Sequence, residues 1–321
     1  MTTVHAALPD GIYVPMLTFF DSDDKVDLPA VQALAARLLD AGVSGLVLHG
    51  SNGEAPHLSH DEKVQNIKAV ASVVANKVPL IAGCNAQSVR ETVELCSEAA
   101  AAGATHALVL PPGYYGSLLD KALIKQFFRD VADNSPIPLL IYNFPGACGV
   151  DLNSDEIIEL AGHDNIVGVK LTCGNTGKLA RIAAATQNIQ KKNQPSKFFV
   201  GGGSADFILQ GAVVGAHGSI CGLANLSPRA CKSILDAFHD GNLAKARALQ
   251  AVVAAGDWLA IRYGFVGVKH GIAAFGSFGA NTVSASAAPR RPCQGLTTAA
   301  KGEFNAGTAD LLGLERELSG L

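Results

Sequence analysis

The sequence has few charged and few aromatic residues, and its composition excludes some classes of partner. Only 17% of its 321 residues are charged, 6% are aromatic, and the net charge is −3 with a pI near 6.3. A nucleic-acid partner is not expected, because such proteins carry a basic surface. Mean hydropathy is high at +0.24. No uninterrupted apolar run reaches about 18 residues, however, so we do not expect a membrane-spanning helix or a membrane partner.

Targeting signals and disulfide patterns are also missing. Residues 1–10 contain no lysine or arginine and no apolar signal core. The seven cysteines are odd in number and form no C-x-x-C pair, which is typical of reduced thiols in the cytosol. We therefore expect a cytoplasmic protein.

Short apolar runs alternate with longer amphipathic stretches along the chain. Each run is apolar on both faces, as in a buried parallel strand. The runs cover residues 12–19, 45–48, 79–82, 106–110, 138–142, 166–170, 197–201 and 218–221. Helical signals lie between them, including the capping patterns Ser59-x-x-Glu62 and Ser88-x-x-Glu91.

Eight strand signals separated by helices predict an α/β fold, namely a closed (β/α)8 TIM barrel with a C-terminal helical extension. An open doubly wound sheet is the alternative, but it usually has fewer strands and a G-x-G-x-x-G after the first. We divide the chain into an N-terminal arm (1–10), a barrel catalytic domain (11–226) and a C-terminal helical extension (227–321). Within the extension, helices are predicted over 228–239, 243–260, 263–274 and 310–318, with a loop over 278–302.

In a barrel of this kind, the chemistry lies at the carboxyl ends of the strands. Lys170 ends the sixth apolar run, where burial removes its hydration and favours the uncharged amine, a nucleophile that forms Schiff bases with ketones. The alternative is a lysine that reaches solvent or pairs with a carboxylate. Tyr142 ends the neighbouring fifth run, so its hydroxyl could exchange protons at Lys170. A purely structural buried tyrosine is the alternative there.

Two loops and a histidine pair are weaker candidates. Residues 50–54 (GSNGE) form a turn whose N–H groups suit a carboxylate, although many turns share this pattern. Residues 201–204 (GGGS) resemble a phosphate loop, or else bring the backbone close to a neighbour. The pair His57-x-x-His60 is closely spaced, and a metal would need further carboxylate or imidazole ligands. His49 and His106 are candidate ligands only because of their positions in the chain. We therefore predict no metal.

Three of these motifs occur together in one order: residues 50–54 (GSNGE), 142–145 (YNFP) and 168–170 (GVK). This combination resembles the pyruvate-dependent class I aldolase family over about residues 11–274. That family includes dihydrodipicolinate synthase, N-acetylneuraminate lyase, 4-hydroxy-2-oxoglutarate aldolase and the 2-keto-3-deoxy sugar acid aldolases. The resemblance implies a Schiff-base enzyme that needs no cofactor.

The resemblance also assigns catalytic roles. It implies that Lys170 forms the Schiff base, that Tyr142 relays protons, and that Ser51 links Tyr142 to a second tyrosine. That second residue resembles Tyr114, lent by a neighbouring subunit, with Tyr115 as the adjacent candidate. The active unit would then be a homo-oligomer, either a dimer or a tetramer.

The same resemblance assigns residues that bind substrate. Ser51 and Asn52 fall where the family binds the pyruvate carboxylate, and Gly202 and Ile220 match positions that line the pyruvyl pocket. Thr172 carries a hydroxyl that could bond a substrate hydroxyl. The implied partners are a small keto acid and an aldehyde.

Two departures from the family pattern concern the substrate. Ala147 stands where dihydrodipicolinate synthases place an arginine that holds a second carboxylate, and Leu171-Thr172 replaces their Glu-Ala. The chain looks closest to the fungal 2-keto-3-deoxy sugar acid aldolases, including those for 2-keto-3-deoxy-L-galactonate, and to 4-hydroxy-2-oxoglutarate aldolase. We therefore expect cleavage of a 4-hydroxy-2-keto acid to pyruvate and an aldehyde. The alternatives are a dihydrodipicolinate synthase-type condensation, a non-catalytic keto-acid binder, a metal-dependent aldolase and a phosphate-sugar enzyme.

Overall fold

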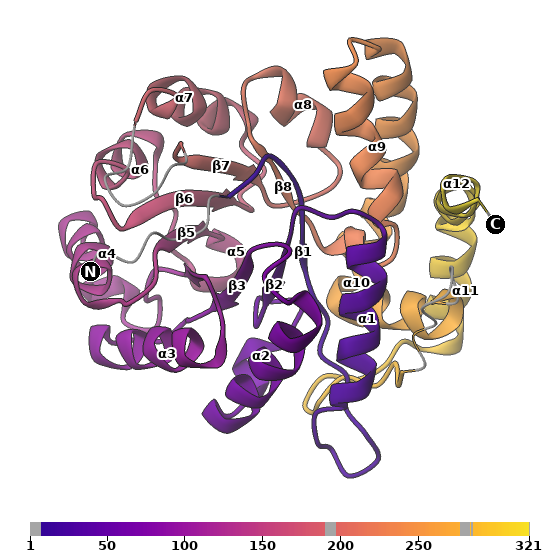
Figure 1. The fold of residues 1–321 in the computed structure, drawn as a ribbon, viewed down its shortest axis with the longest axis horizontal. Coiled ribbons are helices and arrows are strands. Elements are labelled where there is room, and N and C mark those ends of the chain that lie inside the picture. The colour runs from indigo at the N-terminus through magenta and orange to yellow at the C-terminus, as the bar shows by residue number, and fades with distance from the viewer. Residues whose placement is uncertain (1–7, 190–196, 277–282, 284, 321) are drawn as a thin grey trace.

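Eight short parallel strands close into a barrel in chain order in the computed structural model (Figure 1). The structure describes residues 8–189, 197–276, 283 and 285–320. The strands are β1 (Gly11–Pro15), β2 (Gly45–Leu48), β3 (Leu80–Gly83), β4 (His106–Val109), β5 (Leu139–Asn143), β6 (Ile166–Leu171), β7 (Phe199–Gly202) and β8 (Gly218–Ile220). Pairing of Tyr13 with Ile220 closes β8 onto β1. The predicted (β/α)8 TIM barrel is confirmed.

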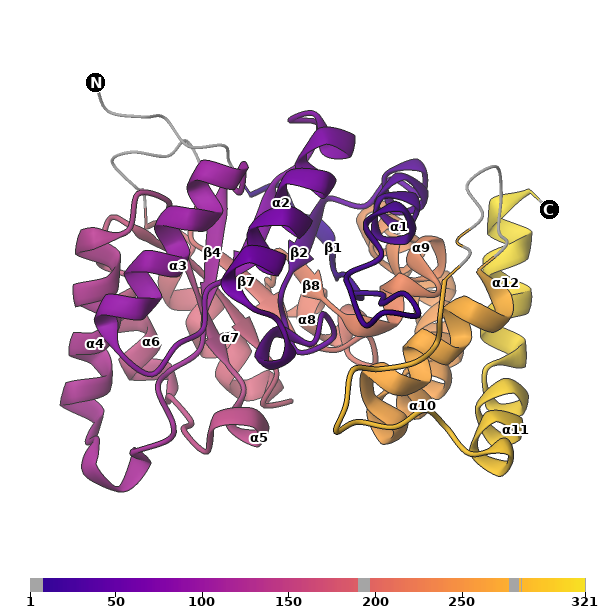
Figure 2. The ribbon, with the colours of Figure 1, turned by 90° about the horizontal axis from the view of Figure 1, so that it is seen from below.

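Helices surround the barrel on the outside, as Figures 1 and 2 show. They are α1 (Leu28–Asp40), α2 (His60–Val74), α3 (Val89–Ala102), α4 (Lys121–Asn134), α6 (Ser154–Leu160), α7 (Thr176–Thr186) and α8 (Ile208–Val213). Short helices follow the ends of several strands: η1 (Ala55–His57), η2 (Gly116–Leu118), α5 (Pro145–Cys148) and η3 (Gly222–Asn225). Ser59 forms the predicted reciprocal capping box with Glu62, and Ser88 caps α3 by accepting from the Glu91 N–H.

Large side chains fill the middle of the barrel. Tyr13 and Phe199 meet edge to face there, with ring centroids 5.1 Å apart. Gly45 and Gly201 make room for these rings, because an added Cβ would lie 2.4 Å from Tyr13 and 2.6 Å from Phe199. A packed interior of this kind is a core and not a pore.

After the barrel the described residues include the helices α9 (Pro228–His239), α10 (Leu243–Phe275), α11 (Thr298–Gly307) and α12 (Ala309–Ser319). The two helices predicted over 243–260 and 263–274 are one element that is interrupted at Gly264, whose φ is 59°. Of the loop predicted over 278–302, residues 278–282 and 284 lie outside the described residues. The prediction is wrong for residues 298–302, which begin α11, where Thr297 caps the helix and Phe304 is buried.

Within the described residues, α10 alone is long and apolar enough to cross a membrane by length and composition. In this fold it packs against α9, η3 and α11. Its Asp257 and Lys269 side chains are buried and hydrogen-bonded to other parts of the chain. Packing within the protein accounts for part of the apolar composition of this helix, since 39% of its most apolar window is buried, whereas Trp258 and Ile261 are exposed.

Candidate active site

A cavity of about 480 Å³ opens at the carboxyl ends of the strands. Its walls come from the ends of β5 and β6, from the loops after β2, β6, β7 and β8, and from one side of α10. Five predicted site residues line it together: Ser51, Asn52, Tyr142, Lys170 and Thr172. The barrel thus brings together residues from distant parts of the chain.

Lys170 lies beside Tyr142 at the floor of this cavity. The two residues are paired across β5 and β6, and the Lys170 Nζ lies 4.2 Å from the centroid of the Tyr142 ring. Lys170 is only 2% exposed. None of the ion pairs found among the described residues involves it. A buried amine over a tyrosine ring can attack a carbonyl, and the hydroxyl of that tyrosine can exchange protons with the reacting groups.

The turn after β2 brings a second hydroxyl to this pair. The Ser51 Oγ lies 3.5 Å from the Tyr142 Oη, a long contact between two groups that can each donate or accept. The turn is held by the Thr18 hydroxyl, which donates to the Gly53 carbonyl at 2.8 Å. Glu54 follows in the left-handed region with a φ of 55°, and its buried carboxylate anchors the turn from behind. Ser51 and Asn52 are therefore presented from a fixed backbone.

Asp257 of α10 organises the opposite wall. One of its carboxylate oxygens accepts from the Ser204 hydroxyl at 2.5 Å, from the Ala205 N–H at 2.8 Å and from the Asp206 N–H at 2.9 Å. Burial raises the pKa of Asp257 to about 6 despite these bonds. Because the amides after the 201–204 loop already bind a carboxylate, the structure gives no support to the phosphate interpretation of this loop.

Two polar atoms in this wall are buried without a hydrogen-bond partner among the described residues. They are the Thr172 Oγ1 and the Asp206 Oδ1, and both residues line the cavity. Buried polar atoms are usually paired, so these two atoms are exceptions within the wall of the cavity. Sequence reasoning missed Asp206 and Asp257. Asp206 could have been predicted from its position just after a strand. Asp257 lies within a helix, and no local sequence feature marks it as a site residue.

Three predicted residues do not line the cavity in the single chain. Gly202 and Ile220 are buried at the ends of β7 and β8, and the next residues along, such as Gly203 and Gly222, form the wall instead. Tyr114 is 79% exposed and lies against Tyr115, with ring centroids 4.9 Å apart. The sequence departure at Ala147 also falls outside the cavity wall, on the exposed side of α5.

The histidines of the His57-x-x-His60 pair contact acidic side chains and do not converge on one site. His57 Nδ1 lies 3.0 Å from the Glu54 carboxylate, and His60 lies 2.8 Å from that of Glu98 and 4.0 Å from that of Glu91. Burial lowers the pKa of His49 to about 3, so its imidazole is neutral at pH 7. Across the part of the chain that the structure describes, no three His, Cys, Asp or Glu residues are grouped as metal ligands.

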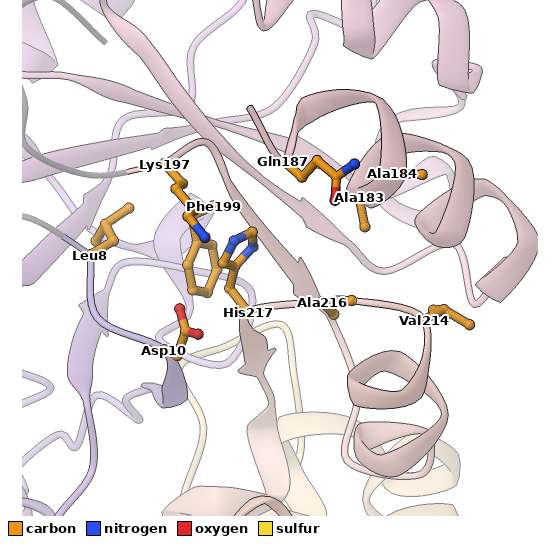
Figure 3. Close-up of a pocket in the computed structure, with 11 residues that line it drawn as sticks. Leu8, Asp10, Ala183, Ala184, Gln187, Lys197, Phe199, Val214, Ala216 and His217 are labelled. Carbon is orange, nitrogen blue, oxygen red and sulfur yellow. The ribbon is translucent and has the colours of Figure 1, made fainter. Parts of the chain in front are cut away.

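A second cavity of about 610 Å³ lies at the amino-terminal end of the barrel (Figure 3). The residues that line it include Asp10, Lys197, Phe199 and His217. The rings of Phe199 and His217 lie side by side, with their centroids 5.9 Å apart. His217 accepts from the Val200 N–H at 3.1 Å, and burial lowers its pKa. None of the predicted site residues lies here, at the end of the barrel that serves stability in this fold.

Known proteins resemble this chain over almost its whole length. Residues 8–308 match the model of the dihydrodipicolinate synthetase family. The chain is 45% identical to an Emericella nidulans protein named "Probable 4-hydroxy-2-oxoglutarate aldolase, mitochondrial", with 97% of each covered. It is 43% identical to the L-threo-3-deoxy-hexylosonate aldolase of Hypocrea jecorina, over 97% of this chain and 99% of the relative.

Solved structures agree with these sequence matches. The structure of a dihydrodipicolinate synthase family protein from Coccidioides immitis is 35% identical and superposes with a TM-score of 0.88, over 98% of this chain and all of the other. That of YagE from Escherichia coli K12, determined in complex with pyruvate, is 28% identical with a TM-score of 0.86, over 95% of this chain and 99% of the other.

Proposed function

Because this chain belongs to the dihydrodipicolinate synthetase family, we propose that it is a class I aldolase that cleaves a 4-hydroxy-2-keto acid to pyruvate and an aldehyde. The observation that carries the proposal is the buried Lys170 amine, which lies beside Tyr142 at the floor of the cavity and has no ion-pair partner among the residues that the structure describes. Relatives named for 4-hydroxy-2-oxoglutarate and for L-threo-3-deoxy-hexylosonate support this reaction. The substrate is thus a 2-keto-3-deoxy sugar acid, such as 2-keto-3-deoxy-L-galactonate, or 4-hydroxy-2-oxoglutarate.

The reaction begins when the uncharged Lys170 Nζ attacks the C2 carbonyl. Tyr142 donates a proton as the C2 oxygen leaves as water, which gives a protonated imine and the Tyr142 phenolate. Tyr142 accepts the proton of the C4 hydroxyl, and the C3–C4 bond breaks. Its electron pair moves through C3 to the iminium nitrogen, which gives an enamine and leaves C4 as the aldehyde carbonyl. Protonation of C3 and hydrolysis by water then release pyruvate and restore the amine.

In this mechanism Ser51 and Asn52 bind the pyruvate carboxylate, and Ser51 connects Tyr142 to a second tyrosine. Tyr114 is that tyrosine and comes from a neighbouring subunit, so the active unit is a homo-oligomer. Its exposure in the single chain, next to the exposed Tyr115 and Leu118, supports a place at a subunit interface. Sedimentation at equilibrium tests the oligomer, and a monomer with full activity would exclude the role of Tyr114.

A condensation of the dihydrodipicolinate synthase type is less well supported. It needs a cation for the second carboxylate, and Ala147 supplies none. The cytoplasmic location remains our proposal, based on seven cysteines that show no paired spacing. Two relatives carry "mitochondrial" in their names, so fractionation of the source cells is the test.

Borohydride reduction in the presence of pyruvate, followed by peptide mass mapping, tests the chemistry directly. We expect a stable pyruvyl adduct on Lys170 and release of pyruvate from 4-hydroxy-2-keto acids. A folded protein that binds a keto acid without forming the adduct would be a non-catalytic member of the family. Loss of activity with a chelator, and no adduct, would identify a metal-dependent aldolase instead.

A further inference from the structure

Two buried polar side chains of α10 hold residues 203–207, which follow β7 and which we call the β7 loop. Three donors from residues 204–206 converge on the Asp257 Oδ2, at 2.5, 2.8 and 2.9 Å. Gln250, about two turns earlier on the same face of the helix, donates to the Ala205 carbonyl at 2.9 Å and accepts from the Leu209 N–H at 2.8 Å. The conformation of the β7 loop therefore depends on a helix that is remote in the sequence.

The β7 loop adjoins the reactive lysine. β6 and β7 are paired so that Lys170 lies opposite Gly201. The Gly203 N–H, at the start of the loop, donates to the carbonyl of Leu171, the residue after the lysine, at 2.8 Å. The loop also forms part of the wall of the cavity that contains Lys170. A change in the loop is therefore a change in the surroundings of the reacting groups.

The part of α10 that carries Asp257 is itself fixed from behind. α10 packs against the C-terminal helices α11 and α12. A Cβ added to Gly256 would lie 2.5 Å from the side chain of Leu311 in α12, which is buried. Since Gly256 directly precedes Asp257, this close approach of α12 fixes the backbone from which the carboxylate reaches the β7 loop.

The Asp257 carboxylate changes its charge close to neutral pH. Its pKa is about 6, because burial disfavours the ionised form and Asp206 adds a like charge. The Cys231 thiol of α9 also faces it, and this thiol stays uncharged, because its hydrogen bond with Cys221 and its burial raise its pKa. Lys170 is the basic residue of the same cavity. Hydrogen bonds to an ionised acceptor are about twice as strong as those to a neutral one, so Asp257 holds the loop most firmly above this pH.

We propose that Asp257 is a positioning residue for the aldolase reaction, whose ionised carboxylate holds the β7 loop in its active conformation and whose protonation loosens the loop and lowers activity. The inference rests on the proposed aldolase function and adds a residue to its machinery. Asp257 acts through the loop and not on the substrate, because its Oδ2 is already bound by three donors of the protein.

Asp257→Asn tests this role, because the amide keeps the shape and one acceptor oxygen but is uncharged at every pH. The measurement is kcat/KM for pyruvate release from a 2-keto-3-deoxy-hexonate, expressed as the ratio of wild type to variant. This ratio removes the pH dependence that Lys170 and Tyr142 give to both proteins. We expect a ratio of about 10 at pH 8, which approaches one as the pH falls through about 6. Asp240→Asn, at the exposed end of α9, is the matched control and should give a ratio near one throughout.

A ratio that stays constant between pH 5 and pH 8 would overturn the proposal. If the variant does not fold, hydrogen exchange of the Ala205 and Asp206 amides in wild type provides a second test. Protection of these amides, relative to their intrinsic exchange rates, should fall by about 10-fold below pH 6, and unchanged protection would also overturn the proposal. The pyruvyl adduct on wild-type Lys170 separates the two proposals. If the adduct forms, the failure concerns Asp257 alone, and if it does not, the aldolase function itself fails.

Discussion

Two lysines buried near the same end of the barrel have opposite surroundings. Lys269 of α10 is completely buried, and its Nζ donates to the Glu54 Oε1 at 2.7 Å and to the Ala288 carbonyl at 2.8 Å. Lys170 is almost as deeply buried, but it faces a tyrosine ring and a cavity, and no ion pair within the described part of the chain involves it. An ammonium held by a carboxylate has no free electron pair, so burial alone does not make a lysine a nucleophile.

The pair formed by Lys269 and Glu54 supports the site from outside. Glu54 ends the turn that carries Ser51 and Asn52, and its Oε2 accepts from the Arg290 N–H at 2.9 Å. Arg290 also binds Glu62 through two nitrogens, at 2.7 and 2.9 Å, and covers the Phe20 ring. We call residues 285–297 the strap, because this segment contacts both Lys269 of α10 and Glu54 of this turn. Lys170 is thus placed for chemistry, whereas Lys269 stabilises the turn that carries Ser51 and Asn52.

Removing the reactive lysine should have the largest effect of any single change. Lys170→Met keeps much of the volume but loses the nucleophile, so we expect turnover to fall by at least about 10⁴-fold. The melting temperature should stay the same or rise, since no carboxylate loses its counter-ion. Pyruvate release and calorimetry measure the two effects, and substantial remaining turnover would show that Lys170 is not the nucleophile.

The same substitution at the other lysine should mainly affect stability. Lys269→Met leaves the Glu54 carboxylate buried without its counter-ion, which costs about 3–5 kcal/mol in the free energy of unfolding. Adding Glu54→Gln should recover part of this loss. Lys232→Met, which breaks an exposed i,i+4 pair with Asp236, is the matched control and should cost about 0.5 kcal/mol or less. Denaturant unfolding measures all of these variants, and equal losses at positions 232 and 269 would contradict the assigned role.

The contrast between these lysines marks the limit of what the sequence could predict. Short apolar runs revealed all eight strands, although residues 16–19 proved to be buried loop and not part of β1. Lys170 and Tyr142 were readable because they end such runs. The partners Glu54 and Lys269 lie 215 positions apart, and no local pattern indicates which buried lysine has an acid beside it.

Weakening the strap should have a moderate effect. Arg290→Ala removes the bonds to Glu62 and Asp24 and the contact with Phe20, and we expect about 1–3 kcal/mol of lost stability. Because the strap braces the turn of Ser51 and Asn52, KM for the keto acid should rise more than kcat falls. Arg262→Ala, which breaks an exposed pair with Glu303, should change neither quantity by a comparable amount. An unchanged KM in Arg290→Ala would show that the strap does not position Ser51 and Asn52.

The smallest expected effect is a pH dependence of stability that comes from Glu62, the carboxylate that Arg290 binds. The hydrogen bonds from Arg290 lower the pKa of Glu62 below its usual value of 4.5. In this range the unfolded chain binds a proton more readily than the native protein, so stability falls as the solution is acidified. The contribution is fully present above pH 4.5 and disappears as the pH falls through the native pKa. With screening by solvent, we expect wild type to exceed Glu62→Gln by about 1 kcal/mol or less at pH 7. That difference should shrink below pH 4.5 in urea unfolding experiments, and a constant difference down to strongly acid pH would mean that Arg290 is held by its other contacts.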